Sequence, residues 1–206
     1  MFQDRDDAAR QLAAQLQRFK GQRPLVLAIP RGAVPMGQTL AQALDGELDV
    51  VLVRKLCAPY QPEVAVGSVD ESGWTYVAPY AASMGADDPY LNEEKARQLN
   101  TIRQRRAQYT PIRPAIDPAG RVVIVVDDGL ATGATMIAAL HGLRNRHPAL
   151  LICAVPVSSP EALEKIKPLA DEVVCLQAPS HFQAVGQFYR HFPQIEDEEV
   201  MRLLKA

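Results

Sequence analysis

The stretch VVIVVDDGLATGAT, residues 122–135, predicts the class of the fold. Five consecutive apolar β-formers, residues 122–126, lead directly into Asp127 and Asp128. A loop of small residues follows, and residues 133–146 then have the pattern of a helix. A short, uninterrupted apolar strand that leads into a helix is typical of a parallel sheet covered on both faces. The stretch therefore predicts an α/β fold.

The rest of the chain repeats this alternation of strands and helices. Further apolar strands are predicted at residues 24–29, 48–54, 150–157 and 172–176. Helices are predicted at residues 4–19, from the first strand's loop to about Leu44, at 87–109 and at 160–167, with two short helical pieces in the C-terminal segment. Strands that alternate with helices predict a parallel sheet flanked by helices.

One segment departs from the alternation. Residues 55–90 are rich in proline and glycine, and within them residues 64–77 predict a hairpin whose turn is Asp70–Gly73. A connection of this length in a compact domain is usually functional. We expect this segment to be a flexible loop or hairpin inserted into a single domain that comprises residues 1–206.

Composition excludes several classes of protein. The chain has 206 residues, 48% hydrophobic content and a net charge of −2, which disfavours a dedicated nucleic-acid or membrane binder. No signal peptide and no membrane-spanning run is recognisable. The three cysteines are scattered with no CxxC, and Cys153 and Cys175 lie in apolar runs, which suggests buried thiols rather than a metal site or a disulfide. We therefore expect a cytoplasmic protein with no protein-held metal.

The residues after the strand of the opening stretch suggest its chemistry. Ligands of open parallel sheets bind at the carboxyl ends of the strands, where Asp127 and Asp128 are expected. The small loop that follows offers backbone amides at a helix start, which favours a phosphate. The loop lacks the lysine of a nucleoside-triphosphate loop, so that motif does not apply. No GxGxxG motif follows the first strand, which argues against a dinucleotide-binding oxidoreductase. A phosphate beside two hydroxyl-accepting carboxylates suggests a ribose 5-phosphate.

VIVVDDGLATGAT resembles the phosphoribosyl pyrophosphate signature of type I phosphoribosyltransferases, and the whole chain resembles a bacterial subgroup of that family. The resemblance implies a small hood, formed by residues 178–206 and the N-terminal helix, and a mobile loop over the site. It also implies that Asp127 and Asp128 hold the ribose hydroxyls. The 5-phosphate would lie on the loop, at Ala131, Thr132, Gly133, Ala134 and Thr135. Gly129 departs from the family pattern, which usually has an apolar residue there.

Two further segments fit the same family. Arg31-Gly32 in AIPRGAV resembles the pyrophosphate loop, which often has an unusual peptide geometry. Arg54-Lys55, at the expected end of the second strand, resembles a basic pair that orotate-type members use against pyrophosphate; an ordinary solvated strand end is an equal alternative. The family implies Mg²⁺ as a cofactor, brought by the substrate near Asp127 and Asp128 rather than held in a protein cage.

The acceptor is less defined by the resemblance. Members that use 6-oxopurines carry an aspartate at the position of Ala131 and a lysine after the next strand, where this chain has VPVSSP. A hypoxanthine or guanine specificity is therefore disfavoured. APSHFQAVGQFY resembles the segment in which an aromatic side chain stacks on the base, which points to Phe182.

The resemblance implies a transferase that moves the phosphoribosyl group of phosphoribosyl pyrophosphate to a nitrogenous, nucleobase-like acceptor and releases pyrophosphate. The alternative is a non-catalytic regulator of the same fold that senses phosphoribosyl pyrophosphate or a nucleotide. A nucleic-acid partner is not expected, and self-association is expected from family analogy alone.

Overall fold

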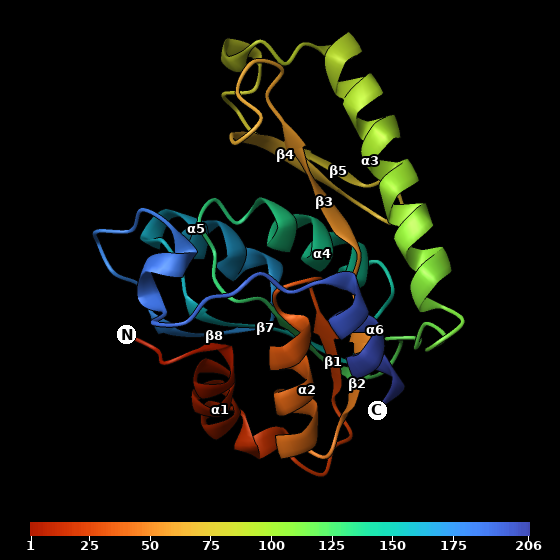
Figure 1. Cartoon of the computed structure of the whole chain (residues 1–206), viewed down its shortest axis with the longest axis vertical. Helices are drawn as coiled ribbons and strands as arrows, with labels where there is room; N and C mark the ends of the chain where they lie inside the picture. The colour runs from red at the N-terminus through yellow and green to blue at the C-terminus, as the bar shows by residue number, and fades with distance from the viewer.

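The computed structural model describes residues 1–206 and has two sheets of different kinds (Figure 1). The larger sheet is parallel, with the strand order β2-β1-β6-β7-β8. Its strands are β1 (Leu25–Ala28), β2 (Glu47–Val50), β6 (Val122–Val126), β7 (Leu150–Val157) and β8 (Glu172–Gln177). The predicted parallel sheet is confirmed, with the strand of the opening stretch, β6, at its centre.

Helices cover both faces of this sheet. Alternate residues of the central strand face two separate cores: Ile124 and Val126 pack with α1 and α2, whereas Val123 and Val125 pack with α4. This explains why β6 shows no polar alternation in the sequence. Figure 1 shows α1 and α2 on one side and α4 and α5 on the other. The helices are α1 (Arg5–Gln15), α2 (Val34–Ala43), α4 (Ala134–Arg144), α5 (Pro160–Ile166) and α6 (Asp197–Lys205).

The smaller sheet projects from this body and is antiparallel, with the order β3-β4-β5. It consists of β3 (Val53–Cys57), β4 (Ala65–Asp70) and β5 (Thr75–Val77), and the long helix α3 (Asp88–Tyr109) lies along it. All six residues of β4 are buried because α3 packs on one side of the small sheet and α4 packs on the other. The predicted β4–β5 hairpin and its turn are confirmed; the mobility of this segment stays a prediction.

The predicted second strand, residues 48–54, is wrong as one element. β2 ends at Val50, and β3 starts at Val53 in the other sheet. The apolar pattern runs through Val51 and Leu52 without a glycine or proline, so the sequence carries no signal of the break. As a result, Arg54 and Lys55 do not end a strand of the large sheet but lie within the small one.

Residues 178–196, between β8 and α6, form the C-terminal segment. It contains the short 3-10 helix Val185–Phe188 and returns to the N-terminus, where Phe2 bridges to Tyr189. The helix α6 then packs against α2. The N-terminal helix α1, which we expected in the hood, covers one face of the large sheet, and its first residue, Arg5, reaches Asp128 beyond β6. None of the helices is both long and apolar enough to cross a membrane.

Candidate active site

The two acidic residues lie directly beyond the last residue of β6, between the neighbouring strands β1 and β7. The backbone N–H of Asp128 donates to Oδ1 of Asp127 over 2.8 Å, which fixes the first carboxylate against the start of the loop. Both side chains are half-buried. The carboxyl end of a central parallel strand is the usual ligand position in this class of sheet.

The small residues after the acids form a tight loop into α4. The N–H of Leu130 donates to the carbonyl of Val157, and the Ser159 hydroxyl donates to the carbonyl of Ala131 over 2.7 Å. Gly133, at the N-cap of α4, has φ +80°, a conformation that glycine adopts without strain. The first N–H groups of a helix have no intrahelical acceptor, so this loop and helix start form a site suited to an anion.

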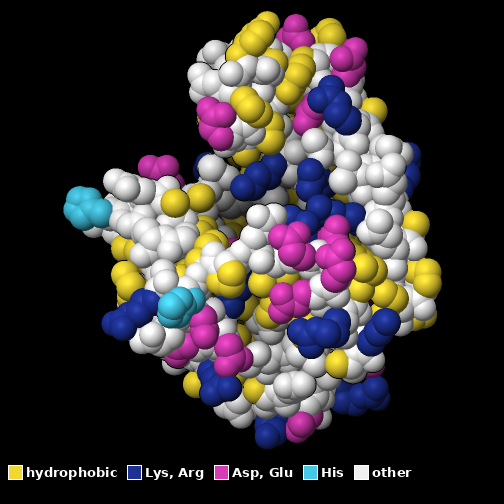
Figure 2. All heavy atoms as spheres, in the orientation of Figure 1, with side chains coloured by type: hydrophobic (Ala, Val, Ile, Leu, Met, Phe, Trp, Pro, Cys, Tyr) yellow, Lys and Arg dark blue, Asp and Glu magenta, His cyan; other side chains and the backbone are white.

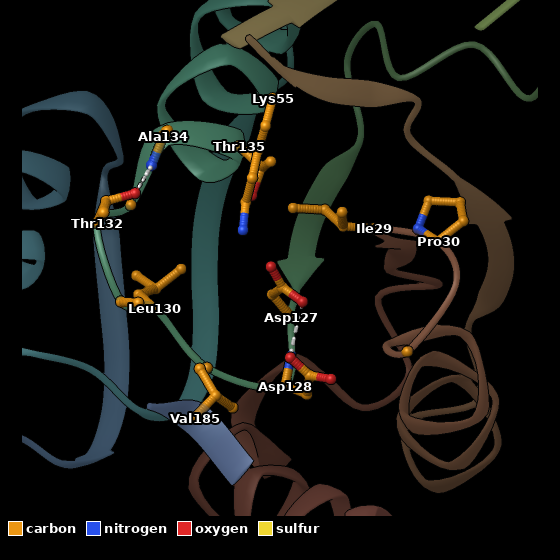
Figure 3. A pocket seen from close by; sticks show the side chains of 14 residues that line it. Ile29, Pro30, Lys55, Asp127, Asp128, Leu130, Thr132, Ala134, Thr135 and Val185 are labelled. Atoms are coloured by element: carbon orange, nitrogen blue, oxygen red, sulfur yellow. Dashed lines mark hydrogen bonds between the residues drawn. The ribbon is translucent and has the colours of Figure 1, made fainter. Parts of the chain in front are cut away.

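A cavity of about 250 Å³ lies between the acids and the loop (Figure 3). Its walls include most of the site residues that the sequence predicts, from three separate parts of the chain. These predicted residues are Gly32, Lys55, Asp127, Asp128 and residues 131–135. The cavity is also lined by Ile29, Pro30, Gly129, Leu130 and, from the C-terminal segment, Val185. The structure therefore brings the predicted carboxylates, loop and lysine to one hollow.

Lys55 reaches this cavity from the small sheet. In Figure 3 the Lys55 side chain extends toward Asp127, and Asp128 lies on the far side of Asp127. The strand that carries it, β3, pairs with β4, and β4 packs on α4, the helix that begins at the loop. The buried Ser68 hydroxyl strengthens this packing, because it donates to the carbonyl of Ala134 over 2.6 Å. Lys55 makes no ion pair, so its charge is available to a ligand.

Three predicted residues do not line this cavity. Arg54 points to the other side of β3, where its Nε donates to Oε1 of Gln98 over 2.9 Å. Phe182 packs on Phe188, with ring centroids 5.1 Å apart. Arg31 lines an adjoining cavity of about 390 Å³, which shares Gly32 and Asp128 with the first.

The turn between β1 and α2 has the unusual geometry that the resemblance implied. The peptide bond between Pro30 and Arg31 is cis. The next residue, Gly32, lies against the acids: a Cβ atom there would be 2.5 Å from Oδ2 of Asp128. Only glycine therefore fits at this point without a shift of the carboxylate.

Two residues that the sequence did not single out, Arg5 and Tyr189, also contact Asp128. The Arg5 guanidinium forms an ion pair with the Asp128 carboxylate at 3.2 Å. The Tyr189 hydroxyl donates to the Asp128 backbone carbonyl over 2.6 Å, and burial raises the pKa of this phenol. A signal for Arg5 exists in the sequence, because it precedes Ala8, Ala9 and Leu12 at helical spacing and so lies on the buried face of α1. No comparable signal exists for Tyr189.

The surroundings of the two acids affect their pKa values differently. Burial, followed by the Asp128 charge, raises the pKa of Asp127 well above its usual value. Burial also raises the pKa of Asp128, but the adjacent Arg5 guanidinium opposes that rise. The acid without a direct cation partner, Asp127, is therefore the one that gains most from a cation or hydroxyl donor in the cavity.

The family follows from a match along most of the sequence. The family model described as "Phosphoribosyl transferase domain" matches residues 2–192. The chain belongs to the phosphoribosyl transferase family. The type I resemblance that rested on VIVVDDGLATGAT is thus confirmed.

Relatives of known sequence or structure agree with this family. A Mycobacterium tuberculosis protein with the provisional name phosphoribosyl transferase is 38% identical over 205 residues, which are 99% of this chain and 46% of that protein. The chain thus spans about half the length of this relative. An adenine phosphoribosyltransferase of Rhodospirillum centenum is 30% identical over 111 residues, 52% of this chain and 64% of that enzyme. A Thermus thermophilus protein of known crystal structure has 46% sequence identity to this chain. The match covers 99% of this chain and 97% of that protein's chain, and its TM-score is 0.82.

Proposed function

We propose that this protein transfers the 5-phosphoribosyl group of phosphoribosyl pyrophosphate to a nitrogenous, nucleobase-like acceptor. The observation that carries the proposal is the shared cavity. Two carboxylates, a loop of small residues at a helix start and an unpaired lysine line one hollow of about 250 Å³. These groups match the hydroxyls, the 5-phosphate and the anionic leaving group of a single substrate.

The reaction breaks the bond between ribose C1 and the pyrophosphate oxygen and forms a bond from C1 to the acceptor nitrogen. Negative charge builds on the departing pyrophosphate, and Lys55 is the cation placed to offset it. Positive charge builds at C1, where the carboxylates of Asp127 and Asp128 stabilise it while they accept hydrogen bonds from the ribose hydroxyls. The loop amides hold the 5-phosphate and so fix the position of C1.

Mg²⁺ fits the donor set of this cavity as an ion carried by the substrate. No three histidine, cysteine or acidic side chains converge to form a complete cage. The carboxylates of Asp127 and Asp128 are oxygen donors of the type Mg²⁺ prefers, and the ion commonly keeps waters and substrate phosphates as its other ligands. When bound, it would neutralise part of the charge on the pyrophosphate.

Residues of the loop and residues that follow β7 limit which nucleobase the site can accept. Ala131 offers no acid or base to a purine nitrogen. The serines that follow β7 are occupied with structure, since the Ser159 hydroxyl donates to the Ala131 carbonyl and Ser158 is fully buried. This supports an acceptor other than hypoxanthine or guanine. The likeness to an adenine phosphoribosyltransferase over half the chain supports a nucleobase as the acceptor class.

Calorimetric titration with phosphoribosyl pyrophosphate and Mg²⁺ tests the donor site. We expect micromolar-range binding by the wild type and none by the Asp127→Asn/Asp128→Asn double variant. Pyrophosphate release is then measured with a panel of nucleobases. Binding with no release on any acceptor would favour the sensor alternative. No binding by folded wild-type protein would refute the transferase and would leave only a sensor of another nucleotide.

A further inference from the structure

Arg5 is a buried charge with an unusually complete set of partners. Its side chain is 10% exposed, although it is the first residue of α1. Nη1 donates to the carbonyl of Pro193 over 2.6 Å, and the guanidinium carbon lies 3.9 Å above the centre of the Phe192 ring. A buried guanidinium needs such partners because it has lost its water. These contacts fix its orientation from the side of the C-terminal segment.

The remaining donors of Arg5 converge on one oxygen atom. Nε and Nη2 lie 3.3 Å and 3.2 Å from Oδ2 of Asp128, and neither bonds to Oδ1. The same Oδ2 faces Gly32, where a Cβ atom would be only 2.5 Å away. One oxygen of the carboxylate is therefore enclosed by Arg5 and Gly32, and the other is left to make contacts elsewhere.

We propose that Arg5 is a positioning residue for Asp128: it holds Oδ2, so that Oδ1 faces the cavity and accepts a hydrogen bond from a ribose hydroxyl. This inference rests on the proposed function. It also gives the C-terminal segment a role, because Phe192 and Pro193 hold the arginine that holds the acid. Arg5 thus sets the orientation of a carboxylate that lies more than 120 positions away in the chain.

A double-mutant cycle tests the inference. Arg5→Met keeps an apolar side chain against Phe192 but removes every donor. We expect affinity for phosphoribosyl pyrophosphate with Mg²⁺ to fall on the order of 10-fold or more, because the Asp128 carboxylate loses the fixed orientation in which it accepts the hydroxyl hydrogen bond. In an Asp128→Asn background the same change should cost little further, because Arg5 acts through Asp128. Arg5→Lys should recover part of the affinity.

Arg10→Met is the matched control. Arg10 lies on the same helix, but its side chain is 75% exposed and it pairs only with Asp6. We expect wild-type affinity for this variant. Thermal unfolding establishes that each variant is folded at the titration temperature, and Arg5→Lys provides a second readout if Arg5→Met is not.

The outcomes separate the inference from the function on which it rests. Losses that add in the double variant would mean that Arg5 binds the substrate directly, and would overturn the positioning role. Unchanged affinity in folded Arg5→Met would overturn it as well, while wild-type binding still supported the donor site. Absence of binding by the wild type would overturn the proposed function and this inference together.

Discussion

Val185 rests directly on the backbone of Gly129: a Cβ atom on Gly129 would lie 2.6 Å from Cγ1 of Val185 and 3.1 Å from Cγ1 of Val157. This contact explains the departure from the family pattern at position 129. A side chain there would displace the C-terminal segment from the loop. The same segment carries Tyr189, whose hydroxyl bonds to Asp128. Gly129 therefore allows the segment to close one wall of the cavity.

Gly129→Ala tests this contact. We expect the free energy of unfolding to fall by about 1–3 kcal/mol, the usual effect of overpacking a close contact. That corresponds to a melting temperature lower by roughly 2–4 °C per kcal/mol for a chain of this size. Val185→Ala in the same chain should restore part of the loss because it removes the nearest methyl groups. A melting temperature unchanged by Gly129→Ala would show that the segment moves aside freely.

Lys55→Met tests the cation that the small sheet contributes. We expect affinity for phosphoribosyl pyrophosphate to fall on the order of 10-fold, since a charge-assisted contact to the anion is lost. The matched control is the adjacent Arg54→Met. Arg54 bonds to Gln98 outside the cavity, so its loss should leave the affinity near that of the wild type. The reverse ranking, measured by calorimetry, would assign the pyrophosphate contact to Arg54.

Asp127→Asn is expected to stabilise the protein at pH 7. Because burial and the Asp128 charge raise the pKa of Asp127 in the fold, the folded state binds a proton more tightly than the unfolded state. The contribution of this group to stability therefore falls as pH rises from 3.8 through the raised pKa. Asparagine removes this penalty and can still accept from the Asp128 N–H.

Thermal unfolding between pH 4 and pH 8 measures this effect. The melting temperature of Asp127→Asn should exceed that of the wild type at pH 7, and the difference should shrink as pH falls toward 4. Asp128→Asn is the contrasting variant. It leaves the buried Arg5 guanidinium without its carboxylate, so we expect no gain in stability. A loss of stability in Asp127→Asn at pH 7 would contradict the assigned penalty.

Gly142→Ala tests the packing of the hairpin on α4. A Cβ atom at Gly142 would lie 1.9 Å from Oδ2 of Asp70, in the turn of the hairpin. Trp74, the single tryptophan of the chain, stacks on His141 with ring centroids 4.0 Å apart. We expect Gly142→Ala to shift the fluorescence of Trp74 to longer wavelength as the turn is displaced and the ring becomes more exposed to water.

Gly120→Ala provides the control for that experiment. Gly120 has φ +70° and no atom near its Cβ position, so alanine there costs stability through backbone strain alone. It should lower the melting temperature without a change in Trp74 emission. Equal emission in the two variants would mean that the hairpin does not depend on the close approach of Asp70 to Gly142.

The centre of the fold and of the site could be predicted from local sequence. Continuous apolar strands report burial on both faces, and acids directly after β6 must lie at the edge where ligands bind. The two-residue link from β2 to β3 could not be predicted, because Val51 and Leu52 continue the apolar pattern.

The distribution of surface charge could not be predicted either. Figure 2 shows basic and acidic side chains close together across the middle of one face, an arrangement that a net charge of −2 does not reveal.

The contacts made by the chain ends could not be predicted for a different reason. Arg5 and Tyr189 meet Asp128 only through tertiary packing, across separations of more than 120 and 60 positions respectively. No local pattern encodes such a pairing. The buried helical spacing of Arg5 with Ala8 and Leu12 suggests burial of the arginine but not its partner.

The two sheets share no backbone ladder, yet Asp127 follows one and Lys55 belongs to the other. They are joined by the short link at Val51 and Leu52 and by packing on α4. Heat that separates them would disassemble the cavity while every strand pairing remained intact. Binding of phosphoribosyl pyrophosphate, the proposed ligand of the cavity, should therefore be lost at a lower temperature than the far-ultraviolet circular dichroism signal.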